Sequence, residues 1–317
     1  MIDPSAGLTR RPLERPPGLY QPTPPRGLAG VFAPICTPFH ADEELDLGAL
    51  RDNLARYALS GIHGYLALGS NGENRSLMEE ERLAVLDVVI RHRGPGQVVL
   101  AGATYDSQRQ AERFLSAAAD LGADYGLVLA PGYFRRQMTA DVLYGYFSTL
   151  ADSAPLPILL YNAPGFNGLA LEPELVGRLA GHPRIVGMKD SASSGMEAFL
   201  VLGRPDFAIL AGSANFLLPA MLAGSPGGTV SLANSFPEVA LRLYEYGRAA
   251  DRVDGPPFQD YVTRVNSAIS GAYGVPGVKA AMDLAGFAGG LPRRPLLPLS
   301  EAQRTELRTT LEREGLL

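Results

Sequence analysis

Lys189 is the residue whose type and position most clearly indicate chemistry. It ends a short apolar run at residues 185–188 and is followed by Asp190 and Ser191. An ammonium carried into a dry pocket loses its hydration, so burial favours the neutral amine, which can attack a ketone and form a Schiff base. The alternative is a lysine at a strand end that extends outward to water. This short segment alone leaves both interpretations open.

Other segments carry groups that could act beside such a lysine. The turn at residues 69–73 reads Gly-Ser-Asn-Gly-Glu, and its glycines allow backbone N–H groups near Ser70 and Asn71 to approach a ligand carboxylate. Tyr161 ends one apolar run and Tyr133 closely follows another, and both carry a hydroxyl suited to proton transfer. Taken singly, the turn is a common tight connection and the tyrosines are ordinary rim aromatics.

The elements that position these residues can be predicted from hydrophobic periodicity. Apolar runs rich in β-branched residues alternate with amphipathic helical patterns, which indicates parallel strands joined by helical crossovers. The predicted strands are residues 31–35, 65–68, 98–101, 126–130, 158–161, 185–189, 208–211 and 229–232. The predicted helices include residues 47–59, 79–91, 108–121, 140–151 and 173–179. This α/β pattern matches a (β/α)8 TIM barrel; an open doubly wound sheet is less favoured because no G-x-G-x-x-G follows the first strand.

Active sites of such barrels lie at the C-terminal ends of the strands, where the candidate residues gather. The candidate catalytic residues are Lys189, Tyr161 and Tyr133. The candidate substrate-binding residues are Ser70, Asn71, Ser191, Gly212, Ser213, Phe166 and Val230. Their joint placement on one face of a barrel favours a catalytic site over a set of unrelated surface positions.

The chain divides into three parts by composition. Residues 1–29 contain seven prolines, which is typical of an extended or flexible arm and unlike a signal peptide or a helical transit segment. Residues 30–235 form the predicted catalytic barrel. Residues 236–317 form a predicted C-terminal helical subdomain, with helical patterns at 237–249, 258–270, 278–284 and 300–312.

Composition narrows the functional classes. The 317 residues are 46% hydrophobic and carry a net charge of −5, so neither nucleic acid nor an anionic membrane surface is an expected partner. Cys36 is the only cysteine, which excludes an internal disulfide and a thiolate zinc site and suits a cytoplasmic protein. The four histidines lack metal-ligand spacing, and no apolar run is long enough to span a bilayer.

Three ordered motifs resemble those of the dihydrodipicolinate synthase / N-acetylneuraminate lyase superfamily of class I aldolases. They are the turn at residues 69–73, the Tyr-Asn-Ala-Pro segment at 161–164 and the Val-Gly-Met-Lys-Asp-Ser segment at 186–191. Similar segments at 33–39, 211–213 and 273–279 extend the resemblance from about residue 30 to about residue 299. The Ser-Asn pair and the Gly-Met-Lys-Asp-Ser segment look most like 4-hydroxy-2-oxoglutarate aldolase.

The resemblance implies a role for each matching residue. Lys189 would form a Schiff base with pyruvate or another 2-oxo acid, with no metal or other cofactor, and Tyr161 would relay protons. The Ser70 hydroxyl and the amides of Ser70 and Asn71 would hold the substrate carboxylate. Tyr133 matches a tyrosine that reaches a neighbouring subunit's site, so a homodimer or homotetramer is expected.

Phe166 departs from the family pattern. It lies in the segment after Tyr161, at the position where dihydrodipicolinate synthases carry an arginine that binds the aldehyde's carboxylate. A phenyl ring cannot make that ion pair. Known 4-hydroxy-2-oxoglutarate aldolases are polar there as well, so a less polar aldehyde partner is expected.

The resulting prediction is a pyruvate-dependent aldolase or lyase that acts on a 4-hydroxy-2-oxo acid. One alternative is a dehydratase or hydratase that acts on a 2-oxo-3-deoxy sugar acid, and another is a dihydrodipicolinate synthase-like condensation. A non-catalytic 2-oxo acid binding protein is disfavoured because Lys189, Tyr161 and Ser70 are all present.

Overall fold

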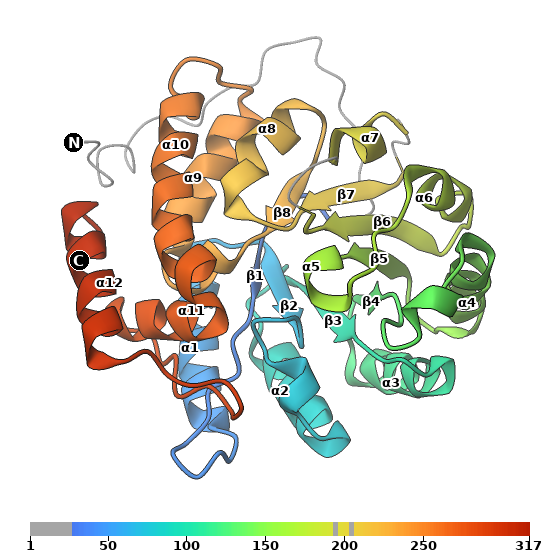
Figure 1. Ribbon diagram of the computed structural model, residues 1–317, viewed down its shortest axis with the longest axis horizontal. Coiled ribbons are helices and arrows are strands. Elements are labelled where there is room, and N and C mark those ends of the chain that lie inside the picture. The colour runs from blue at the N-terminus through green and yellow to red at the C-terminus, as the bar shows by residue number, and fades with distance from the viewer. Residues whose placement is uncertain (1–26, 193–195, 203–205) are drawn as a thin grey trace.

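Eight parallel strands close into a barrel in the order β1 to β8, so the predicted (β/α)8 fold is confirmed. The computed structural model describes residues 27–192, 196–202 and 206–317, so the predicted arm at 1–29 lies almost wholly outside the described residues. The strands are β1 Gly30–Pro34, β2 Gly64–Ala67, β3 Val98–Ala103, β4 Tyr125–Leu129, β5 Ile158–Asn162, β6 Ile185–Asp190, β7 Ala208–Ala211 and β8 Gly227–Thr229. Figure 1 shows them at the centre of the molecule with helices around them.

The helices either connect successive strands on the outside of the barrel or follow the last strand in sequence. They are α1 Leu47–Ser60, α2 Glu79–His92, α3 Gln108–Leu121, α4 Ala140–Ser153, α5 Pro164–Asn167, α6 Pro173–Leu179, α7 Met196–Leu200, α8 Leu217–Leu222, α9 Pro237–Arg248, α10 Gly255–Asn266, α11 Ala272–Leu284 and α12 Glu301–Arg313. Local signals set several ends. Asp46 caps α1 by accepting a hydrogen bond from the Ala49 N–H, and Gly61 ends it in the left-handed conformation.

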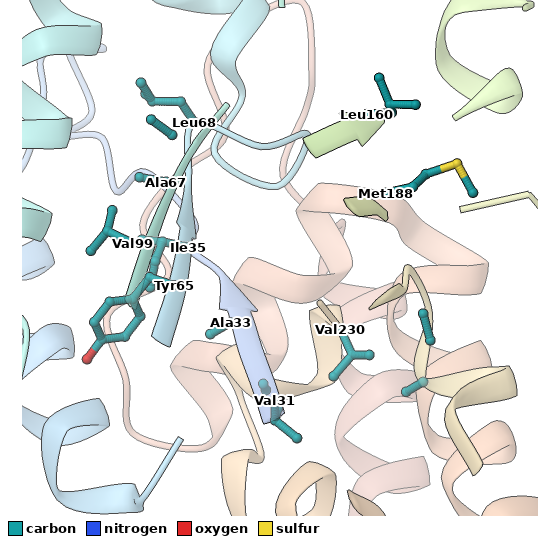
Figure 2. Packing of buried hydrophobic residues seen from close by; sticks show 14 of the residues in the cluster. Val31, Ala33, Ile35, Tyr65, Ala67, Leu68, Val99, Leu160, Met188 and Val230 are labelled. Atoms are coloured by element: carbon teal, nitrogen blue, oxygen red, sulfur yellow. The ribbon is translucent and has the colours of Figure 1, made fainter. Parts of the chain in front are cut away.

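Alternating side chains of the strands build two apolar layers. Phe32, Leu66, Leu100, Leu159 and Leu210 fill the barrel interior. Intervening residues pack outward beneath the helices, and Figure 2 shows ten labelled members of this outer cluster, Met188 and Val230 among them. Successive residues of a strand face opposite sides, so an outward Met188 places the next residue, Lys189, on the inner side.

The register of β5 and β6 brings two polar pairs together at the C-terminal ends of these strands. Tyr161 lies opposite Lys189, and Asn162 lies opposite Asp190. Parallel strands thereby place the phenol and the amine beside each other, although 27 residues separate them in sequence.

The eighth strand differs from its prediction. Residues 229–232 were expected, whereas β8 is Gly227–Thr229 and a 3-10 helix follows at Ser231–Asn234. Glycine is required here, since a Cβ at Gly227 would collide with the backbone of Gly30 on β1, and Gly227 has a φ of 153°. Two of the three residues of this strand are therefore glycines, and only Thr229 is of the β-branched type by which the others were predicted.

The segment after β8 folds into helices that meet the barrel on one side. α9 packs against β1, α1 and α8, and α10 is joined to α11 by a π-helical turn at Ser267–Gly271. Within α11 the chain kinks at Gly274 (φ 58°, ψ −142°), two residues before Pro276. α11 and α12 lie beside each other near the C-terminus in Figure 1. Among the described residues, no helix has both the length and the hydrophobicity needed to cross a bilayer.

Candidate active site

A cleft of about 1230 Å³ opens where the strands end at their C-termini. Its walls come from the turn after β2, the connections that follow β3, β4 and β5, the kinked start of α11 and the loop at 295–297. Two of the predicted site residues at its base are Ser70 and Tyr161. The cleft is therefore built from segments distant in sequence that the barrel topology brings together.

Three predicted residues form a continuous polar chain beside this cleft. The Lys189 ammonium lies 3.4 Å from the Tyr161 hydroxyl, and the Ser70 hydroxyl lies 3.5 Å from the same phenol oxygen. Lys189 and Tyr161 are each only 5% exposed, and the Lys189 nitrogen is 4.5 Å from the centroid of the Tyr161 ring. The interpretation of Lys189 as a lysine extending to water is therefore wrong.

The surroundings of Tyr161 lower the pKa of its phenol. Burial alone raises the pKa of a phenol, but the positive charge of Lys189 and hydrogen bonds from Ser70, Ser191 and Lys189 outweigh it and lower the Tyr161 pKa below its usual value. A phenol with a lowered pKa gives up and regains its proton more readily near neutral pH, as an acid/base group must.

The turn at residues 69–73 presents unused donors. The amides of Gly72 and Glu73 bond to Gly69 and Ser70 within the turn, whereas those of Ser70 and Asn71 donate to no acceptor in the described part of the chain. The Asn71 side chain donates to the Ser231 hydroxyl at 2.8 Å, which ties the turn to the 3-10 helix after β8. Two adjacent free amides and a serine hydroxyl suit a carboxylate ligand.

Glu73, the last residue of the turn, is held by an ion pair that the sequence did not predict. Its carboxylate lies 2.5 Å from the Lys279 ammonium of α11, and both side chains are 1% exposed. Lys279 also donates to the carbonyls of Thr37 and Leu291, and Glu73 accepts the Arg293 backbone N–H. These contacts tie the turn to α11 and to the segment that contains Leu291 and Arg293.

Asp190 and Asn162 brace the same strand ends. Asp190 is fully buried and accepts from the Asn162 amide at 2.7 Å and from the Ala192 N–H at 3.2 Å. Burial raises the pKa of Asp190, with hydrogen bonds from Ala192 and Asn162 opposing that effect. The pair links the residues that follow Tyr161 and Lys189, so it fixes the separation of phenol and amine.

Ser191, Gly212 and Ser213 lie close together beyond β6 and β7. The Ser191 N–H donates to the Asn162 carbonyl, and the Ser191 side chain helps to lower the pKa of Tyr161. A Cβ at Gly212 would collide with the Ser191 hydroxyl, which explains the glycine. Ser213 instead caps the following 3-10 helix by accepting from the Asn215 N–H. Ser191 therefore acts on the phenol of the polar chain, while the Ser213 hydroxyl is used in a helix cap.

The remaining predicted residues, Tyr133, Phe166 and Val230, do not take part in the polar chain. Tyr133 is 78% exposed and Phe166 is 67% exposed, and both lie on the wall of the cleft. The Tyr133 hydroxyl makes no hydrogen bond to the described residues, so it does not join the polar chain within one subunit. Val230 is fully buried in the outer apolar cluster and does not line the cleft, because it follows Thr229, which pairs with the inward-facing Phe32, and successive strand residues face opposite sides.

Asp106 positions the loop that carries Tyr133, and sequence reasoning missed it. It accepts hydrogen bonds from the N–H groups of Gly132 and Tyr133 and pairs with Arg75 at 3.1 Å, so it holds the loop that carries Tyr133. The signal that could have found it is its place shortly after the end of β3, because active sites of such barrels lie at the C-terminal ends of the strands. Among the described residues, no group of three or more His, Cys, Asp or Glu side chains is placed to hold a metal ion.

Solved structures of dihydrodipicolinate synthase family proteins have the same barrel architecture. One is a prophage protein of the dihydrodipicolinic acid synthase family from E. coli K12 in complex with pyruvate, with a TM-score of 0.85, 28% identity, and coverage of 91% of this chain and 99% of that chain. Another is the dihydrodipicolinate synthase from Acinetobacter baumannii complexed with pyruvate, with a TM-score of 0.86, 28% identity, and coverage of 92% and 100%.

Sequence relatives cover nearly the whole chain. A 4-hydroxy-tetrahydrodipicolinate synthase from Methanospirillum hungatei is 32% identical over 290 residues, which are 90% of this chain and 98% of the relative. An uncharacterized DapA-like lyase from Halobacterium salinarum is 34% identical over 294 residues, or 92% and 96%. Residues 27–314 match the dihydrodipicolinate synthetase family.

The chain therefore belongs to the dihydrodipicolinate synthetase family. Enzymes of this family are carbon–carbon lyases that join a lysine to pyruvate as a Schiff base without an external cofactor, so this protein is an enzyme of that class.

Proposed function

We propose that the protein is a pyruvate-dependent class I aldolase that forms or cleaves a 4-hydroxy-2-oxo acid, in the manner of 4-hydroxy-2-oxoglutarate aldolase. The observation that carries the proposal is the buried chain from Lys189 through Tyr161 to Ser70, with hydroxyl contacts of 3.4 and 3.5 Å. An amine, an acid/base phenol and a carboxylate-binding turn are the groups that Schiff-base chemistry on a 2-oxo acid requires.

The proposed reaction begins when the neutral Lys189 amine attacks the pyruvate ketone. Tyr161 protonates the departing oxygen, water leaves, and the protonated imine accepts the electrons released when the methyl group loses a proton. The resulting enamine carbon bonds to the aldehyde carbon, whose oxygen takes up a proton. Water then cleaves the imine, frees the 4-hydroxy-2-oxo acid and restores the amine. Retro-aldol cleavage runs through the same steps in reverse.

The turn at residues 69–73 supports the assignment of the pyruvate carboxylate. The free amides of Ser70 and Asn71 and the Ser70 hydroxyl are adjacent to the Tyr161 phenol, so a carboxylate bound there would orient the ketone towards Lys189. Ser191 helps to lower the pKa of the same phenol and is the additional positioning group in this proposal.

Phe166 favours an aldol reaction other than dihydrodipicolinate synthesis. Its exposed ring lies on the cleft wall where the resemblance places an arginine in the synthases. Relatives named 4-hydroxy-tetrahydrodipicolinate synthase keep that condensation as the second candidate. A dehydratase or hydratase acting on a 2-oxo-3-deoxy sugar acid, which would share the imine, is a further candidate.

Product analysis of a retro-aldol screen tests the proposal. The protein is incubated with 4-hydroxy-2-oxo acids and, separately, with 2-oxo-3-deoxy sugar acids, and pyruvate, aldehyde and dehydrated products are measured by mass spectrometry. We expect equimolar pyruvate and aldehyde from a 4-hydroxy-2-oxo acid. Loss of water without carbon–carbon cleavage, or efficient condensation of pyruvate with aspartate semialdehyde alone, would replace the proposal by the corresponding alternative.

Assembly and location belong to the same proposal. Tyr133 is exposed at the cleft wall and the resemblance assigns it to a neighbouring subunit's site, which supports a homodimer or homotetramer. Burial raises the pKa of the Cys36 thiol to about 12, so this lone cysteine is unreactive and suits the cytoplasm, where thiols stay reduced.

A further inference from the structure

Among the charged side chains that line the cleft wall, one has no partner of opposite charge in the described part of the chain. Four charged side chains line its wall, namely Glu73, Arg75, Asp106 and Arg135. Glu73 is paired with Lys279, and Asp106 is paired with Arg75. Arg135 makes no ion pair with any acid in residues 27–192, 196–202 or 206–317. The guanidinium of Arg135 is therefore available to a ligand in the cleft.

Arg135 is directed to the segment that follows β5. It begins the 3-10 helix Arg135–Gln137 in the connection between β4 and α4. A Cβ at Gly168 would collide with the Arg135 guanidinium, and Gly168 has a φ of 71°, so a glycine in the left-handed conformation makes room for this side chain. Asn167 holds the same segment by donating to the Ala130 carbonyl at 3.1 Å.

Phe166, Gly168 and Arg135 therefore share one wall of the cleft. Phe166 leaves the segment after β5 without a cation, and Arg135 supplies one to this segment from the preceding strand connection. Arg135 lies against the segment in which Phe166 replaces the carboxylate-binding arginine of the synthases. A cation is therefore available to an aldehyde carboxylate despite Phe166, and the expectation of a less polar aldehyde no longer follows.

We propose that Arg135 forms a subsite for the carboxylate of the second substrate, an aldehyde that carries a carboxylate. This inference rests on the proposed aldolase function. A planar guanidinium binds a carboxylate through two parallel N–H···O bonds, and one unpaired cation matches one negative charge better than it matches a phosphate dianion. Pyruvate's own carboxylate is assigned to the turn at residues 69–73, so the two carboxylates have separate sites.

Matched pairs of aldehydes test the subsite. Glyoxylate is compared with 2-methylpropanal, and 4-oxobutanoate with 4-methylpentanal, because each neutral aldehyde has nearly the shape of its anionic partner. Condensation with pyruvate is measured as kcat/KM. We expect the native protein to favour at least one anionic aldehyde over its neutral partner. Arg135→Met should lower kcat/KM for that aldehyde about 10- to 100-fold and leave the neutral partner unchanged.

Arg136→Met is the matched control, since Arg136 is the adjacent exposed arginine and does not line the cleft. It should leave both aldehydes unchanged, whereas Arg135→Lys should restore part of the anionic preference. A native preference for neutral aldehydes, no condensation with any of the four, or an equal loss for both members of a pair in Arg135→Met would overturn the subsite.

Trapping of pyruvate by borohydride separates this failure from failure of the proposed function. A protein that traps pyruvate at Lys189 but shows no Arg135-dependent preference keeps its Schiff-base chemistry and loses only the carboxylate subsite. A protein that traps no pyruvate loses the proposed function and, with it, this inference.

Discussion

At the scale of single residues, Lys189 and Tyr161 could be predicted because the residues next to each in sequence indicate where its side chain lies. An apolar run that ends in lysine indicates an inward strand position, and the structure places Lys189 beside Tyr161 with both side chains 5% exposed. Val230 and Arg135 were not predictable in this way. The orientation of Val230 depends on the register of β8 against β1, and the free charge of Arg135 depends on which acids elsewhere in the chain are already paired.

Tyr161→Phe tests the acid/base assignment. The substitution keeps the ring that packs against Lys189 and removes only the hydroxyl, so pyruvate binding should persist while proton transfer fails. We expect kcat to fall about 10²- to 10⁴-fold with little change in the KM for pyruvate. Steady-state kinetics measure both constants, and a variant with near-native kcat would remove Tyr161 from the mechanism.

At the scale of elements, strand register and one buried ion pair set the geometry of the site. Seven of the strands were predicted from apolar β-branched runs, but β8 was misplaced because close approach to β1 demands glycine. The Glu73–Lys279 pair could not be predicted, because it joins residues separated by more than two hundred positions. Local patterns carry no information about such distant partners.

Glu73→Gln tests how firmly this ion pair anchors the substrate-binding turn. The change leaves the Lys279 ammonium buried without its counter-charge, which typically costs about 3–5 kcal/mol of unfolding free energy. Urea unfolding followed by circular dichroism measures the loss. The double variant Glu73→Gln with Lys279→Met should recover part of it, since the unpaired charge is then gone.

The surface pair of Asp87 and Arg91, in which the arginine is 71% exposed, provides the control for that measurement. Asp87→Asn should cost less than about 1 kcal/mol, because solvent screens exposed ion pairs. A Glu73→Gln variant that loses no more stability than Asp87→Asn would show that the buried pair does not anchor the turn.

At the scale of the whole molecule, the barrel brings segments distant in sequence into one cleft, and the alternation of strands and helices predicted that architecture. The exposed Tyr133 is the part of the site that a single subunit does not complete. Its hydroxyl makes no hydrogen bond to the described residues, although its loop is held by Asp106. This combination is expected if the phenol serves the site of a neighbouring subunit.

Complementation between inactive variants tests this assembly. Tyr133→Phe and Lys189→Ala are co-expressed with different affinity tags, and mixed oligomers are isolated by two purification steps. We expect partial recovery of activity, because one chain can supply Lys189 while its partner supplies Tyr133. Absence of recovery in verified mixed oligomers would mean that Tyr133 acts within its own chain or has no role in catalysis.

The account depends most on the identity of the Schiff-base residue. The most direct measurement is incubation of the protein with pyruvate and sodium borohydride, followed by intact-mass and peptide mass spectrometry. One reduced pyruvate adduct per chain should form on the peptide that contains Lys189, and Lys189→Ala should form none. An adduct on any other lysine, or an unmodified Lys189 in the native protein, would contradict the account.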